Sequence, residues 1–146
     1  MCDNRKIIAV IDEKKKDKND KCKKRKYTLN NQSQKYICTI RLDDCFVPNE
    51  KGREKCDYLI INCDDNVAYF VELKGQKIFK AIEQITQSIR LLSDKLTGCK
   101  INARIVLSEV NTPNLENNPK IQRFEKLLRG YNGNFAKGTI QLEEAV

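Results

Sequence analysis

The 146-residue sequence contains no histidine. This absence excludes the Ser-His and Cys-His catalytic arrangements and any histidine general base. Zinc is also disfavoured, because the seven cysteines are scattered and form no C-x-x-C pair. Any catalysis must therefore depend on carboxylates, lysines, cysteines or a bound metal.

Long apolar runs are absent as well. The longest contain four or five residues, such as IIAVI at 7–11 and YLII at 58–61. A membrane-spanning helix needs about 20 apolar residues, and a signal peptide also needs a longer apolar stretch. The odd number and irregular spacing of the cysteines predict reduced thiols and disfavour disulfides. We therefore expect a single domain over residues 1–146, located in the cytoplasm and without membrane contact.

The net charge of +8 is concentrated in one segment. Residues 13–26, EKKKDKNDKCKKRK, hold nine basic and three acidic side chains. Such a lysine-rich loop could contact phosphates of a nucleic acid, or it could be an ordinary solvated loop. Its composition alone does not decide between these two interpretations.

The pattern of apolar residues predicts an α/β fold with a mixed central sheet flanked by helices. The β-branched residues at 7–11 fit either a strand or one face of a helix. Beyond them we expect strands at 35–42, 57–62, 67–75, 101–109 and 135–144, and helices at 78–96 and 119–129.

Two charged residues interrupt the apolar strand VAYFVELKG at 67–75. Side chains alternate along a strand, so Glu72 and Lys74 point to the same face. A turn at Cys63–Asn66 pairs residues whose numbers sum to 129, which places Asp57 opposite Glu72. A register shift of two residues would place Asp57 opposite Lys74, and a shift of one would move it to the other face. Two opposed carboxylates favour a divalent metal with oxygen ligands, by default Mg²⁺.

These residues resemble the motif of the PD-(D/E)XK nuclease superfamily. Asp57 is followed after fourteen residues by Glu72-Leu73-Lys74, although Cys56 stands where the motif has proline. The resemblance covers residues 56–110 and implies a restriction-endonuclease-like core and metal-dependent hydrolysis of phosphodiester bonds. It also implies Mg²⁺, or Mn²⁺, held by Asp57, Glu72 and the Leu73 carbonyl, with Lys74 positioning the attacking water.

Further site residues follow from the same resemblance. Some branches of the family add a glutamine from the next helix, for which Gln84 is the better match and Gln87 the weaker. Many members supply another acidic residue from a preceding helix. Glu50 and Glu54 are the preferred matches here, with Asp44 and Glu13 as further candidates.

Three functions are open at this point. The first is an endonuclease acting on nucleic acid, with DNA favoured over RNA and a homodimer possible. The second is a catalytically inactive nuclease-like module that binds nucleic acid or a protein. The third is a structural or interaction protein with a coincidental motif, in which the charges lie on the outward face of an edge strand and prevent aggregation. That third interpretation expects polar residues at positions 68 and 70, where the sequence has Ala68 and Phe70.

Overall fold

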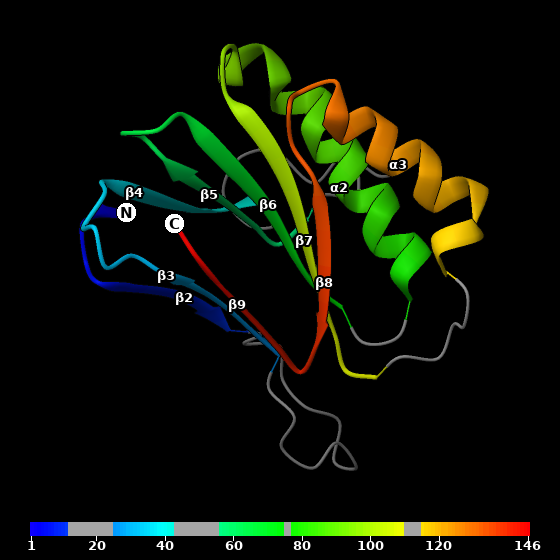
Figure 1. The fold of residues 1–146 in the computed structure, drawn as a ribbon, viewed down its shortest axis with the longest axis horizontal. Helices are drawn as coiled ribbons and strands as arrows, with labels where there is room; N and C mark the ends of the chain where they lie inside the picture. Colours follow the sequence, from blue (N-terminus) through cyan, green and yellow to red (C-terminus); the bar gives the residue numbers. More distant parts are fainter. Residues whose placement is uncertain (12–24, 43–55, 75–76, 110–114) are drawn as a thin grey trace.

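The computed structural model describes residues 1–11, 25–42, 56–74, 77–109 and 115–146. They form a six-stranded sheet, a three-stranded sheet and helices packed on the larger sheet (Figure 1). The larger sheet has the order β1 (Cys2–Asp3), β4 (Ile37–Arg41), β5 (Tyr58–Asn62), β6 (Val67–Lys74), β7 (Lys100–Leu107) and β8 (Phe135–Thr139). The smaller has the order β2 (Ile7–Ile11), β3 (Lys26–Asn30) and β9 (Gln141–Ala145).

The larger sheet is mixed, as the sequence predicts. Strands β1, β4, β5 and β6 pair antiparallel, whereas β6, β7 and β8 pair parallel. The central strands β6 and β7 are almost entirely buried, as expected for strands of a sheet that is covered on both faces. Because β6 lies between β5 and β7, the interpretation of its charges as protection of an edge strand is wrong.

The two faces of the larger sheet are covered differently. Helices α2 (Ile78–Leu92) and α3 (Pro119–Arg129) pack on one face, with their isoleucine, leucine and phenylalanine side chains in a common core. The three-stranded sheet covers the other face through Ile8, Val10, Tyr27 and Leu29. Helices flank the sheet as expected, but in the described ranges α2 and α3 share one face. The second sheet was not predicted.

Several boundaries differ from the sequence prediction. Residues 7–11 form a strand with alternating exposed and buried residues, and β3 was missed at the end of the lysine-rich segment. The helix predicted to Leu96 ends at Leu92 and continues as a 3-10 turn, Ser93–Leu96. A second 3-10 turn, Leu115–Asn117, precedes α3. The last predicted strand breaks at Ile140, whose φ of 68° sends β8 and β9 into different sheets.

A polar network joins the two sheets through β7, β3 and β9. Arg104 of β7 is 5% exposed, and its Nε donates to Glu144 Oε1 of β9 at 2.8 Å. The Tyr27 hydroxyl of β3 donates to the same oxygen at 2.5 Å. Burial, reinforced by the Glu144 carboxylate, raises the pKa of Tyr27. The network therefore compensates a buried guanidinium between the sheets.

The cysteines correct one prediction from the sequence. Cys2 and Cys38 form a disulfide, so the expectation of reduced thiols throughout is wrong. The two residues lie directly opposite each other in the ladder between β1 and β4. Their proximity depends on a pairing between segments 36 residues apart, which cysteine count and spacing do not reveal.

Within the described ranges, the helices are too short or too polar to cross a membrane.

Candidate functional site

The hairpin between β5 and β6 has the register that the sequence predicts. Its pairs run from Tyr58 opposite Val71 to Asn62 opposite Val67, so the paired numbers sum to 129. Four residues, 63–66, connect the strands, and Asn66 takes a positive φ of 55°. Asp57 lies one position beyond the first pair, next to Glu72.

Reciprocal hydrogen bonds join the backbone and carboxylates of this hairpin end. The Asp57 N–H donates to Glu72 Oε2 at 2.9 Å, and the Leu73 N–H donates to Asp57 Oδ2 at 2.9 Å. Glu72 is 0% exposed and Asp57 is 8% exposed. Each carboxylate is therefore held in place by the backbone of the opposite strand.

The site places two acidic groups in a buried environment. Burial of a carboxylate is unfavourable unless hydrogen bonds or a cation compensate its charge, and the backbone donors supply part of that compensation.

The two carboxylates also affect the pKa of the neighbouring Cys56. Burial raises the pKa of the Cys56 thiol, and Glu72 and Asp57 raise it further against an opposing hydrogen bond from Ser88. Cys56 is consequently a protonated, buried thiol and a poor nucleophile.

Helix α2 is connected to the same strand end through a serine. The Cys56 N–H donates to Ser88 Oγ at 2.9 Å, and the Ser88 hydroxyl donates to the Gln84 carbonyl at 2.9 Å. Gln84 is half-buried, whereas Gln87 is exposed and lines a groove between α2 and α3. Of the two candidate glutamines, Gln84 therefore lies on the turn of α2 that contacts Cys56, the residue before Asp57.

Ser88 was not recognised in the sequence as part of this site. It is 1% exposed and lies on the same helix face as Ile85 and Ile89. A lone small polar residue on an apolar helix face is the signal that could have identified it. Buried hydroxyls usually have hydrogen-bond partners, and here the partners are the Gln84 carbonyl and the N–H of Cys56, which precedes Asp57.

Other predicted site residues are described only in part or lie elsewhere. The backbone of Lys74 ends β6 opposite Leu107, but its side chain lies outside the described part of the structure. The Leu73 side chain packs in the core between the two sheets, away from the carboxylates. The additional acidic candidates Glu13, Asp44, Glu50 and Glu54 all lie outside the described residues.

The described donor set suits a hard cation but is small. Carboxylate oxygens are the ligands that Mg²⁺ and Mn²⁺ prefer, and Asp57 and Glu72 supply them from adjoining strands. Within the described ranges, no group of three cysteine, aspartate or glutamate side chains is arranged to hold a metal. Mg²⁺ commonly keeps several waters and uses one or two protein carboxylates, so this pair fits such a mode of binding.

A second surface feature lies between the two helices. A groove of about 350 Å³ runs between α2 and α3, with Phe79 and Phe124 among its apolar residues and Arg90, Lys120 and Arg123 among its cations. The carboxylates of Asp57 and Glu72 do not line it. Both helices begin at the end of the sheet where β6 ends (Figure 1).

Comparisons of the chain with protein-family models, with curated proteins and with solved structures found no match. The resemblance to the PD-(D/E)XK superfamily therefore depends on the residues of this chain alone.

Proposed function

We propose that this protein is a metal-dependent nuclease that hydrolyses phosphodiester bonds, with a restriction-endonuclease-like core and DNA as the favoured substrate. One observation carries the proposal: Asp57 and Glu72 lie next to each other, both buried, at the end of a central β-hairpin. Each carboxylate accepts a hydrogen bond from a backbone N–H across the hairpin. A mixed sheet with a β6–α2–β7 crossover supports it further.

In this proposal Asp57, Glu72 and the Leu73 carbonyl hold Mg²⁺ or Mn²⁺. The bound metal would lower the pKa of a water molecule and neutralise charge on the scissile phosphate. The residues of the chain orient these ligands, because the Asp57 N–H holds the Glu72 carboxylate and the Leu73 N–H holds the Asp57 carboxylate. Lys74 would position the attacking water, and Gln84 would support it from α2.

The surface of α3 supports a nucleic-acid partner. Lys120, Arg123, Lys126 and Arg129 are exposed, and within the described residues none of them forms an ion pair. Clustered, uncompensated cations are suited to phosphate contacts, which weaken as salt rises. Together with the lysine-rich segment, these residues give the protein two basic regions.

The test is a cleavage assay on plasmid, linear duplex, single-stranded DNA and RNA with Mg²⁺, Mn²⁺ or EDTA. We expect cutting that requires metal and is lost in Asp57→Asn and in Lys74→Ala. The matched control is Glu83→Gln, which removes an exposed carboxylate on α2 and should leave cutting unchanged. Metal-dependent cutting that survives Asp57→Asn would contradict the assigned site.

The alternative function is a nuclease-like binding module without catalysis. It is favoured by the small number of acidic ligands within the described residues. This alternative predicts tight binding of nucleic acid with no cleavage in either metal. Binding should then persist in Asp57→Asn and should weaken when Arg123 and Lys126 are both replaced by glutamine.

A further inference from the structure

Three cysteines gather on one face at the edge of the larger sheet. The Cys2–Cys38 disulfide links β1 to β4, and Cys38 is paired with Ile61 of β5 on its other side. Cys63 is the first residue of the turn that follows β5, and its side chain lies on the same face as the disulfide. Its sulfur lies 3.5 Å from Cys38 Sγ.

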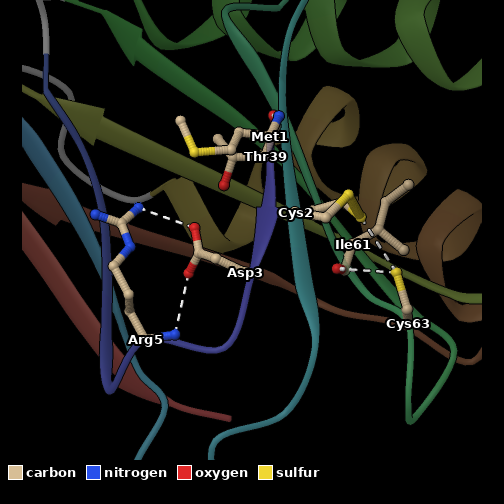
Figure 2. The surroundings of a disulfide bond; sticks show 8 residues. Met1, Cys2, Asp3, Arg5, Thr39, Ile61 and Cys63 are labelled. Atoms are coloured by element: carbon tan, nitrogen blue, oxygen red, sulfur yellow. Dashed lines mark hydrogen bonds and ion pairs between the residues drawn. A yellow bond between two sulfur atoms is a disulfide. The ribbon is translucent and has the colours of Figure 1, made fainter.

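The free thiol is directed at the disulfide. Figure 2 shows the Cys63 side chain turned toward the sulfur–sulfur bond, with its sulfur also near the Ile61 carbonyl oxygen at 3.8 Å. A separation of 3.5 Å between two sulfurs is van der Waals contact, so no rearrangement of the strands is needed to bring them together.

The position of the cluster also makes it accessible. Cys2 and Cys63 are exposed and Cys38 is half-buried, whereas the free cysteine Cys56 is fully buried. Exchange between a thiol and a disulfide requires a thiolate, access and a reachable sulfur. The exposure of Cys63 provides access, and its contact with Cys38 provides a reachable sulfur. The thiolate forms when the Cys63 thiol loses its proton to solvent.

We propose that Cys2, Cys38 and Cys63 form a thiol–disulfide exchange site. The Cys63 thiolate attacks Cys38 Sγ, a bond forms between these two sulfurs, and the Cys2–Cys38 bond breaks. Its electron pair leaves on Cys2 Sγ, which takes up a proton from water to replace the one that Cys63 released. One disulfide and one thiol are present before and after, so the step needs no oxidant or reductant.

The exchange moves a covalent link within the sheet. In one form β4 is tied to the N-terminal strand β1, and in the other it is tied to the turn of the β5–β6 hairpin. The accessible thiol moves in the opposite direction, from Cys63 to Cys2. This inference depends only on the cysteine cluster and not on the proposed nuclease function.

The experiment is disulfide mapping of the full-length folded protein. The protein is incubated at about pH 8.5, where an ordinary cysteine is half ionised, then quenched with acid, alkylated, digested without reductant and analysed by mass spectrometry. We expect two linked peptide pairs, Cys2–Cys38 and Cys38–Cys63. Cys63→Ser should give only the first pair, and the control Cys99→Ser should give both.

A second variant keeps the test decisive if one pairing dominates in the wild type. In Cys2→Ser, mild oxidation with diamide should form Cys38–Cys63 faster in the folded protein than in urea. The proposal is overturned if Cys38 of this oxidised variant stays free, or if it pairs with Cys22 or Cys45 in place of Cys63. It is also overturned if folded and urea-denatured protein give the same distribution of pairs.

Discussion

Replacing Cys56 by proline would place before Asp57 the residue that the PD-(D/E)XK motif has at that position, yet the structure predicts that this change destabilises the surroundings of Asp57. The Cys56 N–H donates to the hydroxyl of Ser88, and proline has no N–H to donate. Such a hydrogen bond contributes about 0.5–1.5 kcal/mol to the free energy of unfolding. Cys56 and Ser88 are 0% and 1% exposed, so water cannot easily replace the lost partner.

A double-mutant cycle isolates this hydrogen bond from the other effects of proline. Proline also restricts the unfolded chain, which stabilises by about 0.4–1 kcal/mol and would hide part of the loss in a single variant. We therefore compare Cys56→Ala with Cys56→Pro, each with and without Ser88→Ala. The Ser88→Ala change should cost about 1 kcal/mol more beside alanine than beside proline, because only the alanine variant retains the N–H.

The measurement is the free energy of unfolding from urea titration, supported by thermal unfolding. For a chain of this length, a difference of 1 kcal/mol corresponds to a melting-temperature shift of about 2–4 °C. An equal cost of Ser88→Ala in the two backgrounds would refute the reasoning, since the hydroxyl would then not depend on the Cys56 N–H. Metal affinity of Cys56→Pro, measured by calorimetry, would show whether displacement of Asp57 follows.

Three further predictions concern packing, pH and thiol reactivity. Gly133→Ala should cost at least about 3 kcal/mol, since an added Cβ would lie 1.5 Å from the Ile101 carbonyl oxygen. Stability should fall by about 1.4 kcal/mol per pH unit above about pH 10, because the unfolded chain loses the Tyr27 proton while the folded chain keeps it. Tyr27→Phe should remove that part of the slope in urea titrations. Iodoacetamide should label Cys56 only after unfolding, as peptide mapping can show.

Each of these has a matched comparison. Gly98→Ala adds a Cβ with no atom within 4 Å but at a positive φ of 83°, so it should cost only about 1–2 kcal/mol. If Gly133→Ala were equally mild, the close approach to Ile101 would be disproved. An unchanged alkaline slope in Tyr27→Phe would mean that another group titrates. Equal labelling of Cys56 and the exposed Cys63 in folded protein would contradict the burial of Cys56.

The placement of the two carboxylates was predictable because it depends on local geometry. The alternation of side chains and one short turn determine the register of a hairpin, so Asp57 and Glu72 could be brought together from sequence numbers alone. The apolar neighbours Ala68 and Phe70 also pointed correctly to a central strand. The link from Cys56 to Ser88 could not be predicted, since it depends on the rotation of α2 against the sheet.

The features that were missed depend on contacts between distant segments. β3 follows a run of lysines, and its apolar residues Tyr27 and Leu29 become recognisable as a strand only beside β2 and β9. The break at Ile140 likewise occurs inside a segment that reads as one continuous strand. Cys2 and Cys38 become neighbours only when β1 pairs with β4.

The pairing of β3 with β9 has a consequence for how the protein is made. Lys26 lies opposite Gln141, so these neighbours are separated by more than a hundred residues of intervening chain. During synthesis β2 and β3 emerge long before the strand that completes their sheet. Until β9 is made, one edge of β3 has no pairing partner and can be bound by chaperones or by other chains. The three-stranded sheet is therefore expected to form late and slowly, after the β5–β6 hairpin that carries the carboxylates.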